Sequence, residues 1–228
     1  MSQGLIPATI LTGFLGSGKT TLLKRVLSEN HGKKIAVIEN EFGEENIDNE
    51  ILVDDAGKEQ ILQLSNGCVC CTIREDLRST LTTLAEKKRK GELDFDRVVI
   101  ETTGLADPGP VAQTFFMDDE IAESYLLDSI LTLVDAKHGD GQLDARQEAR
   151  RQIGFADQIF ISKTDLVDAE TVEALIHRVK HMNPRAPQRK VNFGDVPIAE
   201  VFDLRGFNLN AKLDIDPDER RRPPPPRW

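Results

Sequence analysis

Short apolar runs alternate with longer amphipathic stretches over most of this 228-residue chain. The apolar runs are apolar on both faces, which is typical of buried strands in a parallel sheet. The stretches between them carry apolar residues at helical spacing. The pattern therefore predicts an α/β fold, with a mainly parallel sheet flanked by helices on both faces. The expected strands are residues 8–12, 34–39, 60–64, 97–102, 129–135, 158–161 and 189–192, and the expected helices are about 22–27, 73–90, 143–154 and 169–183, with a short helix from Pro110.

The pattern fades after about residue 207. Residues 214–228 contain Asp-Pro-Asp-Glu, three consecutive arginines and four consecutive prolines. Such a composition does not supply the apolar surface that a packed core needs. We therefore expect one domain over residues 1–207 and a disordered Pro/Arg-rich tail over residues 208–228.

Charge and composition exclude several classes of function. The 39 acidic and 29 basic residues leave a net charge of −10, which argues against a nucleic-acid-binding surface because phosphate contacts need basic patches. The chain has no apolar run long enough to cross a membrane and no signal-peptide pattern at its start, so we expect a cytoplasmic protein without membrane contact. All three cysteines lie within four consecutive positions, which is not the pattern of a disulfide framework.

The segment 13–21, Gly-Phe-Leu-Gly-Ser-Gly-Lys-Thr-Thr, matches the phosphate-binding P-loop at every fixed position and lies between a predicted strand and a predicted helix. The glycines let successive backbone N–H groups turn toward an anion, and the helix N-terminus adds its positive dipole end. Lys19 is expected to reach the β- and γ-phosphates, and the Thr20 hydroxyl to hold Mg²⁺. The sequence thus predicts a P-loop NTPase fold whose nucleotide contacts include Gly13, Gly16, Ser17, Gly18, Lys19, Thr20 and Thr21.

A carboxylate follows the predicted strand 97–102. Glu101 is placed to hold a Mg²⁺-bound water or to orient the attacking water, and the Gly104 N–H is placed to contact the γ-phosphate. We expect Lys19, Glu101 and Gly104 to act at the reacting phosphate. Because no glutamine is placed to orient water as in Ras, intrinsic hydrolysis is expected to be slow.

The turn Ser162-Lys163-Thr164-Asp165 follows the strand 158–161. Guanine presents two donors, and a single carboxylate, that of Asp165, accepts both in a bidentate pair. Adenine lacks this pair of donors, so Asp165 is expected to reject it. The stem of Lys163 is expected to lie over the base. The usual motif begins with Asn, whereas this chain has Ser162.

Three thiols lie in the short segment Cys68-Val69-Cys70-Cys71. Thiolates are soft ligands for Zn²⁺ or another thiophilic ion. Since adjacent cysteines strain a single tetrahedral site, one or two thiols together with a side chain from elsewhere are expected. Glu39 and Glu44 are the nearest candidates, because Glu39 ends the strand that precedes the loop.

Taken together, the P-loop, Glu-Asn-Glu-Phe-Gly-Glu at 39–44, Asn-Gly-Cys-Val-Cys-Cys at 66–71 and Glu-Thr-Thr-Gly-Leu-Ala-Asp-Pro-Gly-Pro at 101–110 closely resemble the CobW-type metallochaperone GTPases. The resemblance implies a SIMIBI-class GTPase that uses GTP and Mg²⁺, binds Zn²⁺ or cobalt, and serves a client metalloprotein. It also implies that Glu39, Glu44 and Cys68 are metal-site residues and that Cys70 and Cys71 complete the family's C-x-C-C motif.

The resemblance leaves some points open. Family members usually carry a second, C-terminal domain, and we expect it to be absent from this sequence. A homodimer is one of the assemblies that the sequence leaves open. Two other functions are also open: an ATP- or GTP-dependent enzyme of cofactor biosynthesis, and a metal buffer with a vestigial nucleotide site. Asp165 argues against the first, and the intact Lys19 and Thr20 argue against the second.

Overall fold

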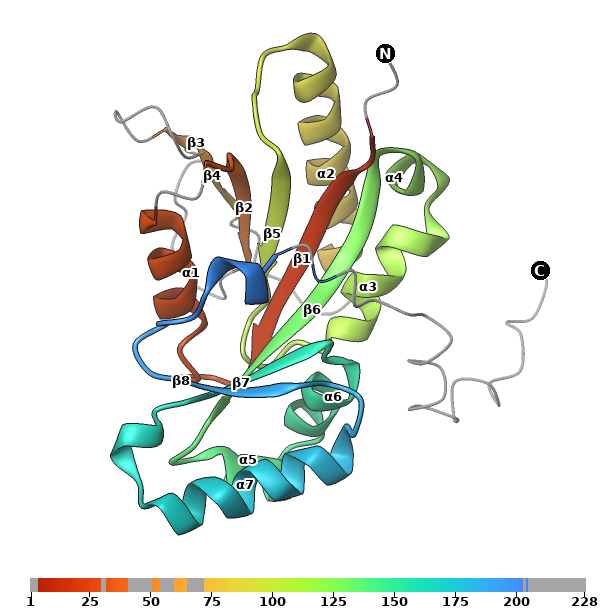
Figure 1. Cartoon of the computed structure of the whole chain (residues 1–228). Helices are drawn as coiled ribbons and strands as arrows, with labels where there is room; N and C mark the ends of the chain where they lie inside the picture. Colours follow the sequence, from red (N-terminus) through yellow and green to blue (C-terminus); the bar gives the residue numbers. More distant parts are fainter. Residues whose placement is uncertain are drawn as a thin grey trace, which may run out of the picture.

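The structure, a computed structural model, describes residues 4–29, 32–40, 51–53, 60–64, 72–202 and 204. The strands in this part of the chain form one sheet in the order β3-β4-β2-β5-β1-β6-β7-β8 (Figure 1). All neighbours are parallel except β3 and β4. The strands are β1 (Ile6–Gly13), β2 (Ile35–Asn40), β3 (Ile51–Val53), β4 (Gln60–Leu64), β5 (Arg97–Glu101), β6 (Tyr125–Asp135), β7 (Gln158–Ser162) and β8 (Gln188–Val191).

Helices connect most of the parallel strands, as is usual for crossover connections. They are α1 (Lys19–Ser28), α2 (Thr72–Lys90), α3 (Pro108–Met117), α4 (Asp119–Ser124), α5 (Gly139–Ala145), α6 (Gln147–Phe155) and α7 (Ala169–Met182), with the 3₁₀ turns η1 (Thr164–Leu166) and η2 (Ile198–Glu200). The prediction of an α/β fold with a mainly parallel sheet is confirmed.

Because successive strand residues point to opposite faces and both sets are apolar, the sheet has a core on each face. A row of isoleucines crosses the central strands at paired positions: Ile38, Ile100, Ile10 and Ile130. All four are buried in a cluster with side chains of α2, α3 and α4. The next residue along β1, Leu11, is buried in a separate cluster with α1 and the segment 196–202. The strands are therefore apolar on both faces because each face is covered by separate elements.

Three local features differ from the sequence prediction. The expected helix 143–154 is two helices, α5 and α6, because Arg146 between them is extended at φ −128° and ψ 122°. The helix expected from Pro110 begins at Pro108, where the Asp107 carboxylate accepts a hydrogen bond from Gly109 N at 2.9 Å and caps the helix. Strand β3 and helix α4 were not predicted.

The described residues include no helix that is long and apolar enough to cross a membrane. The domain boundary near residue 207 and the predicted tail over residues 208–228 lie outside the described residues.

Candidate functional site

The P-loop lies at the carboxyl end of β1 in the conformation that its glycines permit. Gly13, Gly16 and Gly18 have φ values of 143°, 74° and 99°, a region that side-chain-bearing residues rarely adopt. Helix α1 begins immediately afterwards, at Lys19. The helix N-terminus and the curled backbone therefore meet at one point, as binding of phosphate requires.

The P-loop side chains that are predicted to contact phosphate and Mg²⁺, Lys19 and Thr20, both make hydrogen bonds within the site. The Lys19 ammonium donates to Gly13 O at 2.9 Å and is buried, with 8% of the residue exposed. Burial lowers the pKa of Lys19, and the nearby Glu101 carboxylate opposes this effect. The Thr20 hydroxyl donates to Glu101 Oε1 at 3.0 Å. Hydroxyl and carboxylate oxygens are the ligands that Mg²⁺ prefers, so this pair fits a P-loop magnesium site.

The loop after β5 lies directly against the P-loop. A Cβ on Gly104 would lie 2.5 Å from the backbone N of Leu15, so only glycine permits this approach. The strand end is fixed beside it, because Thr102 N donates to Leu11 O at 2.9 Å and the hydroxyls of Thr102 and Thr12 are 2.9 Å apart. The structure therefore brings Gly104 to the phosphate-binding loop, as its position in the sequence suggested.

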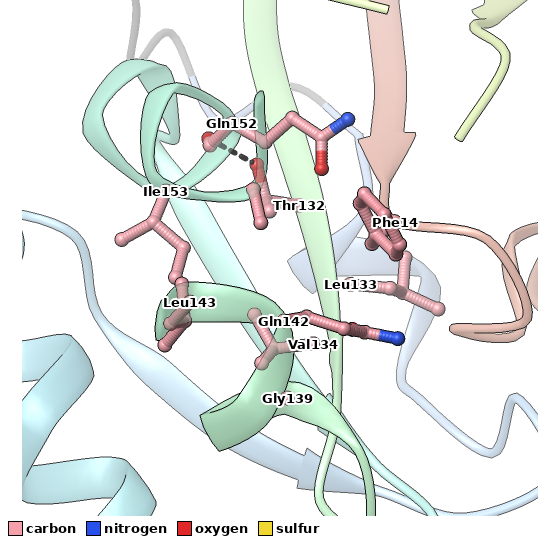
Figure 2. A pocket seen from close by; sticks show the side chains of 10 residues that line it. Phe14, Thr132, Leu133, Val134, Gly139, Gln142, Leu143, Gln152 and Ile153 are labelled. Carbon is pink, nitrogen blue, oxygen red and sulfur yellow. Dashed lines mark hydrogen bonds between the residues drawn. The ribbon is translucent and has the colours of Figure 1, made fainter. Parts of the chain in front are cut away.

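Gln152 of α6 holds this loop in place and was missed by the sequence analysis. Its side chain is buried, and Nε2 donates to Gly104 O at 3.1 Å and to Ala106 O at 3.0 Å. Its backbone carbonyl accepts from the Thr132 hydroxyl at 2.9 Å (Figure 2). One signal was available: Gln152 occupies the apolar face of α6, between buried positions, where a polar side chain needs a specific partner.

Figure 2 shows the small pocket between β6, α5 and α6 that Gln152 lines, with the Phe14 ring entering from the P-loop. Lys19, Thr20 and Lys163 are not among its lining residues, so it is not the nucleotide site. It is a gap between the back of the P-loop and α6. The P-loop and α6, the helix that holds the Gly104 loop, thus line the same pocket.

The turn predicted to read the base is joined to the P-loop. The Ser162 hydroxyl donates to Ser17 O at 2.6 Å, so the serine that stands in place of the usual asparagine still makes a hydrogen bond to the phosphate-binding backbone. Lys163 has a left-handed backbone at φ 57°, and Asp165 is exposed after it. The residues of the two motifs that are predicted to bind the nucleotide therefore lie on one edge of the sheet.

Asp135, at the end of β6, positions Lys163 and was not singled out from the sequence. Its carboxylate is buried and accepts from Lys163 Nζ at 2.8 Å, and it lies 3.1 Å from His138 Nδ1. Burial raises the pKa of the Asp135 carboxyl, but the hydrogen bonds from Lys163 and His138 outweigh burial and hold the pKa below its usual range. Asp135 is therefore ionised at neutral pH and anchors the lysine stem.

Only part of the predicted metal site can be located. Glu39 of β2 is paired in register with Glu101 of β5, so the two residues lie on the same face of neighbouring strands. Strand β4 lies on the other side of β2, with Leu64 paired to Asn40. Glu44, Cys68, Cys70 and Cys71 lie outside the described residues. Among the residues that are described, no group of three His, Cys, Asp or Glu side chains could hold a metal ion.

Comparison with known proteins identifies the family. The model of the CobW/HypB/UreG nucleotide-binding domain matches residues 7–190. The chain belongs to the CobW/HypB/UreG family. The resemblance drawn from the motifs is thereby confirmed.

Relatives in this family include the zinc chaperone YjiA of Escherichia coli, which is 48% identical over 208 residues, 91% of this chain and 64% of that protein. The zinc-regulated GTPase metalloprotein activator 1 of Schizosaccharomyces pombe is 38% identical over 92% of this chain and 52% of its own length. The crystal structure of Zn(II)-bound YjiA GTPase from E. coli matches with a TM-score of 0.72 and 42% identity, over 90% of this chain and 64% of that one.

HypB from Helicobacter pylori shares the fold, with a TM-score of 0.52 at 19% identity, over 92% of this chain and 88% of that one. The chain spans about half to two thirds of the length of the two curated relatives described above.

Proposed function

We propose that this chain is a slow GTPase that binds a transition metal ion, zinc or cobalt, and passes it to a client metalloprotein under the control of the bound nucleotide. The names of its relatives support this proposal: a zinc chaperone, a zinc-regulated GTPase metalloprotein activator and the zinc chaperone CobW of Sinorhizobium sp., which is 34% identical. We place the protein in the cytoplasm, where thiols such as Cys68, Cys70 and Cys71 stay reduced.

One observation carries the link between nucleotide and metal. Glu39 and Glu101 are paired across neighbouring strands, and Glu101 Oε1 accepts from the Thr20 hydroxyl at 3.0 Å. A residue of the proposed cargo site and a residue of the Mg²⁺ site therefore lie next to each other. Two carboxylates on neighbouring strands repel each other, and a cation relieves that repulsion.

The residues of the chain have separable tasks in hydrolysis. Lys19 neutralises charge on the β- and γ-phosphates, and the N–H of Gly104 donates to the γ-phosphate. Glu101 orients the attacking water or a water on the metal. Thr20 would hold Mg²⁺, which would supply positive charge to the phosphates. The transferred metal is cargo, held by Glu39, Glu44 and the thiols of 68–71.

Nucleotide selectivity tests the GTPase assignment. Wild-type protein should bind GTP with much higher affinity than ATP, because the Asp165 carboxylate accepts both donors of guanine. Asp165→Asn should weaken GTP and favour xanthosine triphosphate, whose base has an acceptor where guanine has its amine. Affinities are measured by calorimetry, and the release of GDP and phosphate is followed with GTP.

Asp168→Asn is the matched control. Asp168 is a neighbouring exposed carboxylate whose role is to cap α7, where it accepts from Thr171 N at 2.7 Å, and asparagine is an equally good cap. This variant should keep the wild-type preference for GTP. Equal affinity of the wild type for ATP and GTP would contradict the proposal and favour an ATP-dependent enzyme.

A further inference from the structure

The loop after β8, residues 192–195, joins the predicted base-recognition turn, residues 162–165, to α1. The Asn192 side-chain carbonyl accepts from the backbone N of Thr164 at 3.0 Å and from its hydroxyl at 3.1 Å. A Cβ on Gly194 would lie 3.0 Å from Leu22 Cα, so the loop backbone packs on the first turns of α1. The loop is therefore held at both ends, beside the two elements that this fold uses for a nucleotide.

Phe193 lies at the centre of this loop in an unfavourable setting. It is 80% exposed, so its ring gains little from the protein core. Its backbone is left-handed, at φ 52°, which is rare for a bulky residue and costs free energy. Lys163 and Phe193 are the only residues other than glycine with positive φ in the described part of the chain. Both lie at the corner where Asn192 binds Thr164, and strain of this kind is concentrated at ligand sites.

Phe193 lies on a loop next to the turn that is predicted to bind the base. Strands β7 and β8 are parallel neighbours with Ser162 paired to Val191, so the loops that follow them leave the same edge of the sheet. Phe193 follows Asn192, and Asp165 follows Thr164, the residue that Asn192 binds. The carboxylate that is predicted to recognise the edge of a base is thus accompanied by an exposed aromatic ring on a loop that Asn192 joins to the same turn.

We propose that Phe193 stacks on the purine base of the bound guanine nucleotide, on the face opposite the stem of Lys163. This inference rests on the proposed function of the same site. Lys163 is anchored to Asp135 at 2.8 Å, and Phe193 is held by the bonds of Asn192. In this proposal the two side chains contact opposite faces of the planar base, and Asp165 selects the base by its hydrogen-bonding edge. Phe193 contributes affinity, whereas Asp165 contributes selectivity, because every base has a π-face.

A fluorescent reporter tests the contact directly. The chain has one tryptophan, Trp228, so Phe193→Trp in a Trp228→Phe background places a single indole in the loop. GDP should quench its fluorescence by stacking, whereas inorganic tripolyphosphate, which lacks a base, should not. Phe193→Ala should weaken GDP and GTP by the same factor, about 5- to 150-fold for the loss of one stacked base. Phe193→Tyr, which keeps an aromatic ring, should bind GDP and GTP with wild-type affinity.

Met117→Ala is the control for loss of an exposed apolar side chain, since Met117 ends α3 and is 77% exposed; it should bind GDP as the wild type does. Wild-type affinity of Phe193→Ala for GDP would overturn the inference while leaving the proposed function intact. A lower oligomer mass of Phe193→Ala with unchanged affinity for GDP would also overturn the inference, because Phe193 would then contact another chain. Failure of the wild type to bind any guanine nucleotide would overturn both proposals.

Discussion

Lys19 shows how a single side chain is held ready for a phosphate. Its ammonium group donates to the carbonyl of Gly13 at 2.9 Å, within the same loop that is proposed to receive the nucleotide. Burial lowers the pKa of Lys19, because the charged form loses the stabilisation that bulk water would provide. An arriving phosphate supplies the missing negative charge, and the interaction is strong because the site is partly desolvated.

Replacing Lys19 should therefore impair chemistry without unfolding the protein. Lys19→Ala should reduce single-turnover hydrolysis of GTP by about 100-fold or more, as loss of a positioned donor to a developing charge does. Thr20→Ala should raise the Mg²⁺ concentration needed for half-maximal rate, because its hydroxyl is the proposed ligand. Thermal melts should show both variants folded.

Lys24 of α1 provides the control, since it is exposed on the same helix. Lys24→Ala should hydrolyse GTP at the wild-type rate. A folded Lys19→Ala variant with wild-type activity, or an unfolded one, would show that the role assigned to Lys19 is wrong.

At the scale of elements, α6 is tied to the loop after β5. Gln152 donates to two carbonyls of this loop, and the neighbouring Arg151 forms an ion pair with Asp107, the cap of α3. Asn183, at the end of α7, donates to Ile153 O at 2.8 Å and to Ala156 O at 2.9 Å. Hydrogen bonds therefore join the Gly104 loop to α6, and α6 to the end of α7.

Gln152→Leu should lower kcat for GTP about 10-fold while the affinity for GDP stays within about twofold, since a misplaced donor costs rate rather than ground-state binding. The free energy of unfolding should fall by about 1–3 kcal/mol, because the carbonyls of Gly104 and Ala106 lose their partner. Steady-state kinetics and urea denaturation measure the two effects separately.

Gln142→Leu is the control for this prediction. Gln142 lines the same pocket (Figure 2), and no described hydrogen bond joins its side chain to the Gly104 loop. Its kcat should match the wild type. A Gln152→Leu variant that loses stability but keeps its kcat would show that Gln152 only supports the fold.

At the scale of the whole molecule, the parallel sheet brings the ends of distant segments to one edge. The P-loop, Glu101, Asp135 and the base-recognition turn all lie at carboxyl ends of central strands, which is where α/β sheets bind their ligands. Glu39 lies at the same edge, beside Glu101. Nucleotide and metal are therefore expected to sense each other through neighbouring strands.

Zinc affinity should depend on the bound nucleotide. A coupling of about 5- to 150-fold between GDP and a non-hydrolysable GTP analogue is expected, and linkage requires zinc to change the affinity for the analogue by the same factor. Removal of zinc with a chelator should reverse this change. Because thiols bind metal as thiolates, zinc affinity should rise with pH through the thiol range. Competition with a zinc-binding dye and calorimetry of the nucleotide provide the two measurements.

Glu39→Ala, Cys68→Ser, Cys70→Ser and Cys71→Ser should each weaken zinc binding or its coupling to the nucleotide. Glu92, which is exposed and lies two residues beyond the end of α2, serves as the control, and Glu92→Ala should change neither. Identical zinc affinity with GDP and with the GTP analogue would refute the coupling.

The sequence by itself was sufficient for the fold class, and it predicts the phosphate and base motifs. These features depend on local chemistry: short continuous apolar runs that form buried strands, glycines that permit positive φ in the P-loop, and a carboxylate after a strand. Each can be recognised within a few residues, because the physical requirement is met within those residues. The short strand β3 and the break at Arg146 carry no comparable local signal.

The tertiary structure alone decided which distant residues act together. The position of Gln152 on the apolar face of α6 indicates that it needs a partner, but only the fold shows that the partner is Gly104 O. Asp135 is recognisable from the sequence as a strand end, but only the fold places Lys163 Nζ 2.8 Å from its carboxylate. The pairing of Glu39 with Glu101 depends on the strand order, which places β2 next to β5. Likewise, only the hydrogen bonds of Asn192 to Thr164 show that the exposed Phe193 lies next to the predicted base-recognition turn. Such contacts join elements far apart in the chain, and residue type alone cannot specify the register and packing that bring them together.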